Sequence, residues 1–429
     1  MPVAVDQVRR PLVVYLDTQD FSRFGDTIRG ISDPEAADTF EQLVQLSESG
    51  QVVFPCSMPL ISELLQYTAE TREICLAKAA AVEKLCGEWA LPFPTRLVGM
   101  EIAEALISHG RAVATGPIRY LVGDRYWYPN VGNMFSGVRE KMRDEVQAAF
   151  AGLQPQTYTA RRKVKAAKKK FKISKFANQL TFEEAERDLG IPADEARKVL
   201  VPLIKGRLSG EEASRRLMNV IAPPEKFVEI FFEKYKGDST ELPLWLRSAG
   251  DTLKSSIDES IRQKVAPFRD MPGATELLRE IYGTQANEYR LIIPKLGFED
   301  ASEFASIAEK DLQDGKHNDL LASLPSSTSL AESFHGYMEQ VLGLKGNIAK
   351  LERSIAGDLM HLLYLPHVDL WRGDRRFSAV VMERLPSHAR RVVPRLRDLM
   401  ERIASLDPHP NPPRAPSRVA GDPTAVRLG

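Results

Sequence analysis

The sequence of 429 residues contains only three cysteines, Cys56, Cys75 and Cys86. Their odd number and the lack of a CxxC spacing argue against a disulfide framework and against a zinc site. The first residues lack an apolar signal segment, and no run approaches 18 apolar residues, so we expect neither export nor a membrane span. We therefore expect a cytoplasmic protein whose reduced thiols lie in a core or on a helix face.

An overall charge bias is also lacking, because 58 Lys and Arg residues balance 58 Asp and Glu residues. No general attraction to nucleic acid or to membranes is expected, so any such attraction must be local. The sequence contains no HExxH, GxSxG or GxxxxGK[ST] motif, and no GxGxxG after a strand. These absences weaken assignments as a metalloprotease, a serine hydrolase, an ATPase or a dehydrogenase.

Short apolar runs predict three parallel strands followed by helices. Residues 11–16 form a continuous β-branched run typical of a central parallel strand, and residues 51–54 and 367–371 predict two further strands. Helices are expected after a capping box at Ser32–Glu35, from Pro59, and over residues 358–365 before Pro366. The pattern predicts an α/β fold, with a small parallel sheet flanked by helices.

The middle of the chain has a different character. Residues 110–325 show charged, amphipathic helical patterns with few strand-like runs, and capping-box spacing recurs at Thr181–Glu184 and Ser209–Glu212. We expect a core split into residues 1–109 and 326–405, a large all-α insertion over 110–325, and a disordered, proline-rich tail over 406–429.

Four acidic residues are distinguished by their positions. Asp17 follows the first strand, Glu63 lies in the helix after the second, Asp358 opens an apolar helix, and Asp374 follows the third strand. The carboxyl ends of parallel strands meet at one sheet edge, so these four acids are expected to converge. Their mutual repulsion would be relieved by Mg²⁺ or Mn²⁺. Taken alone, Asp358 and Asp374 also fit a helix N-terminal acid and a turn acid paired with arginine.

The segments around these acids, YLDTQDF, SELLQ, GDLMHLLYLPHVDLW and GDRRF, resemble in the same order the four motifs of PIN-domain nucleases. The resemblance covers residues 10–108 and 326–395 and leaves the middle unexplained. It implies a small parallel sheet that holds these acids around divalent metal, and RNA cleavage that leaves a 5′-phosphate and a 3′-hydroxyl. The chain would then be a metal-dependent endoribonuclease. The alternative is an inactive PIN-like scaffold that binds RNA or a protein through its helical domain.

The resemblance also implies roles for individual residues. Asp17, Asp358 and Asp374 would be metal ligands and catalytic residues, with Glu63 a ligand directly or through water. Thr18, Ser62 and Arg375 would support the ligands or contact phosphate. An inhibitory protein partner and the oligomeric state stay open.

Further residues near the expected site have structural interpretations. Glu101 could add a fifth acid, but an exposed helix acid is the favoured reading. His361 and His367 are expected to be half-buried, hydrogen-bonded histidines rather than ligands. For residues 126–128, the aromatic cluster YWY before Pro129, packing at a core corner is favoured over stacking on bases.

The strongest local charge lies between residues 161 and 175, where nine of fifteen residues are basic and none is acidic. The basic residues are Arg161, Arg162, Lys163, Lys165, Lys168, Lys169, Lys170, Lys172 and Lys175. With Phe171 available to stack on a base, this run fits a strip that follows RNA phosphates. A solvated helix face or a disordered arm fits equally well.

Overall fold

The computed structural model describes residues 10–31, 34–65, 69–130, 157–170, 182–236, 274–345 and 355–406, with the single positions 148, 255, 259 and 263. The chain divides into two compact units. The first unit comprises residues 1–64, 73–127 and 249–429, and the second comprises 65–72 and 128–248. The helical region expected over 110–325 is therefore shared between the two units.

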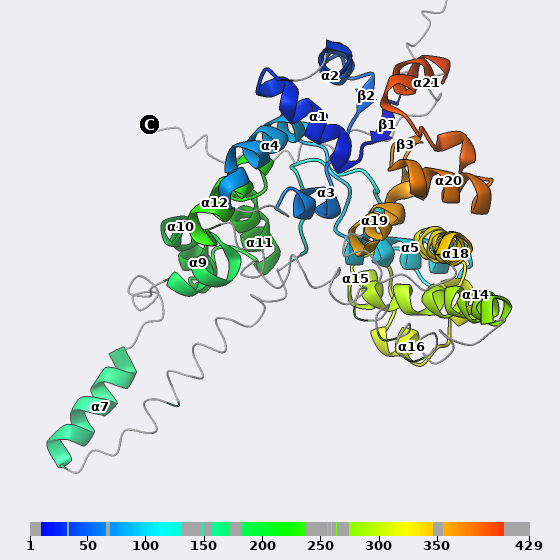
Figure 1. The fold of residues 1–429 in the computed structure, drawn as a ribbon. Coiled ribbons are helices and arrows are strands. Elements are labelled where there is room, and N and C mark those ends of the chain that lie inside the picture. The colour runs from blue at the N-terminus through cyan, green and yellow to red at the C-terminus, as the bar shows by residue number, and fades with distance from the viewer. Residues whose placement is uncertain are drawn as a thin grey trace, which may run out of the picture. The chain divides into compact units, whose positions relative to one another are not determined.

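The first unit contains a parallel sheet of three strands, β1 (Leu12–Tyr15), β2 (Val52–Val53) and β3 (Leu370–Trp371), in the order β2-β1-β3 (Figure 1). Leu12 pairs with Val52 on one side, and Tyr15 pairs with Trp371 on the other. The prediction of a central parallel strand at residues 11–16 is confirmed. A parallel bridge also joins Val392 to Trp371.

Helices surround this sheet. The elements of the first unit are α1 (Thr18–Ile28), α2 (Pro34–Glu48), α3 (Met58–Glu63), α4 (Arg72–Cys86), α5 (Pro94–Ser108), α14 (Ala274–Ile292), η6 (Ile293–Gly297), α15 (Phe298–Ala301), α16 (Glu309–Gln313), α17 (Asn318–Leu321), α18 (Pro325–Lys345), α19 (Ile355–His361), η7 (Leu362–His367), α20 (Arg375–Arg384), η8 (Ala389–Arg391), η9 (Leu396–Asp398) and α21 (Leu399–Ser405), where η denotes a 3₁₀ helix. The α/β prediction is thus confirmed at the level of a small parallel sheet with surrounding helices.

The sheet is built from fully apolar runs. All four residues of β1 are buried, and so are both residues of β2 and of β3. Burial of consecutive residues on both faces explains why these strands lack the alternation of a half-exposed sheet. Cys56, Cys75 and Cys86 are buried free thiols, as expected.

One helix was not predicted, and two local predictions were wrong. α1 was not expected, since only Phe21 and Phe24 mark its buried face. The α-helix before the third strand ends at His361, and Pro366 lies inside the 3₁₀ helix η7, so the apolar run does not stop at the proline. β3 accordingly begins at Leu370, later than expected.

The second unit is helical in its described part. It contains η1 (Ala69–Thr71), α7 (Tyr158–Lys170), α9 (Glu183–Leu189), α10 (Ala193–Ile204), α11 (Gly210–Asn219) and α12 (Pro224–Lys234). Its buried side chains include Ile191, Leu217, Val228 and Phe231. The expected cap at Ser209 is confirmed, because its hydroxyl accepts a hydrogen bond from Glu212 N at 3.1 Å. Ser32, Thr181 and segment 407–429 lie outside the described residues.

Two general predictions can also be compared with the described residues. None of the described helices is long and apolar enough to cross a membrane. Trp127 and Tyr128 are both fully buried, which agrees with the expected packing role of this aromatic cluster.

Candidate metal centre

Asp17 lies just beyond the carboxyl end of the central strand. It is the residue before α1 and has extended backbone angles, φ −82° and ψ 155°, but its side chain makes no capping hydrogen bond to that helix. One ligand atom from each of Asp17, Glu63 and His361 lies within 4.8 Å of the other two. The segment after β1 and the ends of α3 and α19, which are far apart in sequence, therefore meet at this sheet edge.

Glu63 is the last residue of α3, and that helix is anchored at its first turn. Ser57 caps α3, since its Oγ accepts a hydrogen bond from Leu60 N at 3.4 Å. The same Oγ lies 2.6 Å from the hydroxyl of Tyr15, the last residue of β1. The start of α3 is thus tied to the strand that leads to Asp17.

Gly357 makes room for the Glu63 carboxylate. A Cβ atom added at Gly357 would lie 2.6 Å from Glu63 Oε1, well inside van der Waals contact. A glycine in the first turn of α19 therefore permits the close approach of α3 and α19. The side chain of Glu63 is only 13% exposed, so it faces the interior of this unit rather than the solvent.

His361 is a member of the cluster that the sequence interpretation had set aside. It is 4% exposed, its Nδ1 lies 2.5 Å from the Tyr15 hydroxyl, and its Nε2 lies 3.2 Å from Glu63 Oε1. Burial lowers its pKa, but Glu63, Asp17 and Asp358 outweigh burial and raise the pKa to about 9. A positive imidazolium thus offsets part of the negative charge. The sequence contained one indication of this role, because His361 follows Asp358 by three residues and residues at that spacing share a helix face.

Asp358 and Asp374 complete the acidic pocket. Together with Asp17 and His361 they line a small cavity of about 10 Å³, roughly the space of one water molecule. Asp374 also caps α20, with its Oδ1 accepting a hydrogen bond from Phe377 N at 2.7 Å. The four predicted acids are therefore brought together, three on this cavity and Glu63 beside His361.

The carboxylates perturb one another. Burial raises the pKa of Asp358 to about 7, with a further increase from Glu63, and burial likewise raises the pKa of Asp17. Glu63 shows the reverse, because His361 outweighs the effect of burial and lowers its pKa. The cluster is costly when fully ionised, except where the imidazolium compensates it.

The residues predicted to assist the ligands have mixed positions. Thr18 is buried, and its hydroxyl contributes to lowering the Glu63 pKa. The Ser62 hydroxyl donates a hydrogen bond to Pro59 O at 3.0 Å, within its own helix. Arg375 is exposed, whereas Arg376 Nη2 lies 3.4 Å from Asp358 Oδ2 and 3.6 Å from Asp374 Oδ2. Arg376 therefore contacts the acids directly, and the phosphate contact expected of Arg375 stays a prediction.

A buried ion pair beside the cluster was also missed. Asp20 is fully buried, and its Oδ1 lies 3.1 Å from Nη2 of Arg372, which is 4% exposed. Burial raises the Asp20 pKa to about 7, although Arg372 acts in the opposite direction. Asp20 follows Asp17 by three residues, a helical spacing that would have indicated this second acid had α1 been expected.

Glu101 is neither a fifth ligand nor an exposed acid. It is 2% exposed and accepts hydrogen bonds from Ser326 N at 3.0 Å and from Ser326 Oγ at 2.7 Å. His367 Nε2 lies 2.6 Å from the same carboxylate, which confirms a hydrogen-bonded role for that histidine. Glu101 thus accepts a hydrogen bond from a backbone N–H in the first turn of α18, and through His367 it links that helix to η7.

The basic run lies in the second unit. Arg161, Arg162, Lys163 and Lys165 are exposed on α7, and that helix also includes Lys168, Lys169 and Lys170. Phe171, Lys172 and Lys175 lie outside the described residues. The first part of the run is therefore helical, and its proposed contact with RNA stays a prediction.

The donor set at the acidic cluster fits a divalent ion. Ligands on opposite sides of a Mg²⁺ ion lie about 4 Å apart, close to the spread of the Asp17, Glu63 and His361 atoms. Carboxylate oxygens suit Mg²⁺ and Mn²⁺, and the added imidazole nitrogen favours a transition ion such as Mn²⁺. No family model, curated protein sequence or solved structure matches the chain.

Proposed function

We propose that the chain is a divalent-metal-dependent phosphodiesterase that cleaves RNA internally. The observation that carries the proposal is the meeting of Asp17, Glu63 and His361 within 4.8 Å, at the carboxyl edge of a parallel sheet. The adjoining carboxylates of Asp358 and Asp374 line the neighbouring cavity. Two carboxylates and an imidazole would hold Mn²⁺ or Mg²⁺, with the two other acids near its open side.

A bound divalent ion would supply Lewis-acid polarisation of the phosphodiester and an ionised water nucleophile. The residues of the chain prepare that chemistry. With His361 neutral and its Nδ1–H donated to the Tyr15 hydroxyl, which would in turn donate a hydrogen bond to Ser57 Oγ, His361 Nε2 would be available to the ion. Arg376 stands beside Asp358 and Asp374, so a phosphate entering there would meet a guanidinium group.

The decisive experiment is cleavage of end-labelled, mixed-sequence RNA by the full chain in Mn²⁺, Mg²⁺ or EDTA. We expect cleavage with Mn²⁺ and none with EDTA. Asp17→Asn should lower the rate by about a hundredfold or more, because it removes a ligand. Asp38→Asn is the matched control, since Asp38 is exposed on α2. An intact RNA substrate with both ions would refute the proposal, and cleavage of DNA alone would refute the choice of RNA.

One observation favours a second function, an inactive scaffold that binds RNA or a protein. His361 already compensates Glu63 at 3.2 Å, so the cluster is partly neutralised without an ion. Thermal unfolding with and without Mn²⁺ separates the two cases. An enzyme should be stabilised by Mn²⁺ in a manner that Asp17→Asn abolishes, whereas a scaffold should show neither the stabilisation nor the cleavage.

A further inference from the structure

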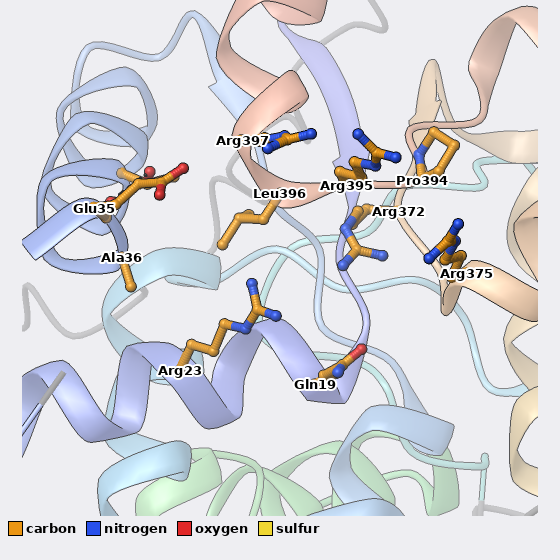
Figure 2. Close-up of a pocket in the computed structure, with 11 residues that line it drawn as sticks. Gln19, Arg23, Glu35, Ala36, Arg372, Arg375, Pro394, Arg395, Leu396 and Arg397 are labelled. Carbon is orange, nitrogen blue, oxygen red and sulfur yellow. Dashed lines mark hydrogen bonds between the residues drawn. The ribbon is translucent and has the colours of Figure 1, made fainter. Parts of the chain in front are cut away.

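A second pocket in the first unit is lined by arginines and has a volume of about 410 Å³ (Figure 2). Arg23, Arg372, Arg375, Arg395 and Arg397 line it, and Glu35 is the acidic residue in its lining. The arginines come from α1, the segment after β3, the first turn of α20, and residues 395–397 at the start of η9. Figure 2 shows Arg23 and Arg372 extending into the same space from opposite sides.

Part of this positive charge is not neutralised by neighbouring acids. Arg372 pairs with buried Asp20, and Arg397 Nε lies 3.6 Å from Asp398, a contact between two exposed side chains. In the described part of the chain, Arg375 and Arg395 form no ion pair within 4.0 Å and are exposed. The pocket therefore presents guanidinium groups that an anionic ligand can reach.

The lining suits a ligand that is more extended than a single phosphate. Five arginines converge from four segments. Asp20 pairs with Arg372, Asp398 lies beside Arg397, and Glu35 adds one negative charge to the lining, so the pocket keeps a net positive charge. Guanidinium groups match the oxygens of phosphate through paired hydrogen bonds, so this lining suits several phosphate groups in succession. A polyanion with regularly repeated phosphates satisfies these conditions.

The pocket adjoins the candidate metal centre. Arg372 lines both the arginine pocket and the small acidic cavity. Gln19 and Arg375, which also line the arginine pocket, lie two residues after Asp17 and one residue after Asp374. A strand with one phosphate at the acidic cluster would therefore carry its neighbouring phosphates towards the arginines.

We propose that the arginine pocket binds the phosphate backbone of the RNA strand beside the phosphodiester that is cleaved. The assignment of RNA rests on the function proposed above. The pocket supplies permanent positive charge next to a cluster that is negative until an ion binds. Sequence-independent backbone binding follows, because guanidinium–phosphate contacts carry no base information.

The test measures binding of a fluorescein-labelled, single-stranded RNA in EDTA by fluorescence anisotropy, at several salt concentrations. We expect Arg375→Ala/Arg395→Ala to weaken binding about tenfold or more. The slope of log affinity against log salt should become shallower by about 1.4, the value for two phosphate contacts on a single strand. Arg279→Ala/Arg390→Ala removes the same charge from exposed positions outside the pocket and should change the slope far less. Arg375→Lys/Arg395→Lys should restore most of the slope.

Several results would overturn the inference. The pocket variant could bind RNA as tightly as the control variant, or the unaltered chain could bind no RNA. Binding to phosphatidylserine vesicles with none to RNA would assign the pocket to membranes instead. Because EDTA prevents metal-dependent cleavage, this result is separable from the nuclease proposal. If the chain binds RNA through the pocket but does not cleave it in Mn²⁺, only the nuclease proposal is refuted. If the chain cleaves RNA but Arg375→Ala/Arg395→Ala binds RNA as tightly as the unaltered chain, only the pocket proposal is refuted.

Discussion

Asp358 is predicted to destabilise the ion-free protein at neutral and alkaline pH. Its side chain is 22% exposed, and burial with a further increase from Glu63 raises its pKa from 3.8 to about 7. A carboxyl group with a raised folded-state pKa costs stability progressively as the pH rises from the unfolded pKa to the folded pKa. Above pH 7 the whole cost is present. Asp358→Asn keeps the shape of the side chain and removes the charge.

The size of the effect follows from the shift. At about 1.4 kcal/mol per pKa unit, the cost of ionised Asp358 is about 4 kcal/mol at pH 8.5 and about 2 kcal/mol at pH 5. The variant also loses the 3.4 Å contact with Arg376, a partly exposed pair for which we allow about 1 kcal/mol. The free energy of unfolding should therefore rise by about 3 kcal/mol at pH 8.5 and by about 1 kcal/mol at pH 5.

Urea unfolding in EDTA at the two pH values measures this difference. Asp38→Asn provides the control, since Asp38 is an exposed acid on α2 and should give nearly equal changes at both pH values. Addition of Mn²⁺ at pH 8.5 should then stabilise the unaltered chain more than Asp358→Asn, because the ion relieves the same repulsion. If Asp358→Asn gains no stability at pH 8.5, or gains equally at both pH values, the electrostatic account of the cluster is incorrect.

Three further predictions concern the ion and the substrate. Gly357→Ala should weaken Mn²⁺ binding measured by calorimetry, because the added Cβ would displace the flexible end of the Glu63 side chain. The free energy of unfolding in urea should change little. An unchanged Mn²⁺ affinity would refute the close approach of Gly357 to the Glu63 carboxylate. Mn²⁺ affinity should rise about tenfold per pH unit between pH 6 and pH 8, since His361, with a pKa of about 9, must release a proton to bind the ion; a flat profile would exclude it as a ligand. Lys163→Ala/Lys165→Ala should weaken RNA binding and its salt dependence, measured by anisotropy, and an unchanged slope would remove α7 from the RNA-binding surface.

The sheet and its acids could be predicted because they depend on local sequence. Residues 12–15 are buried on both faces, and such strands appear as continuous apolar runs. Asp17 and Asp374 follow strands, so parallel topology alone brings them to one edge. Helix α1 escaped prediction because its buried face contains few apolar residues, of which Phe21 and Phe24 are the large ones.

Roles that depend on packing between distant segments could not be predicted in this way. Glu101 and Ser326 are far apart in the chain, and nothing near Glu101 shows that it receives the first turn of α18. Which of the two arginines, Arg375 or Arg376, contacts the acids depends on where α20 begins. With Asp374 as the cap, the second helical residue, Arg376, is the one that lies beside the acids.

The arginines of the pocket differ in how far the fold itself requires their charge. Arg372 cannot be removed cleanly, because buried Asp20 would lose its ion-pair partner, and such a loss is strongly destabilising. Arg375 and Arg395 are exposed and carry no comparable structural duty. Charge that is not needed for folding, placed beside acids that repel one another without an ion, is more readily explained by an anionic ligand than by stability. The proposals for the arginine pocket and for the acidic cluster are therefore consistent with one another, as parts of one phosphate-binding surface.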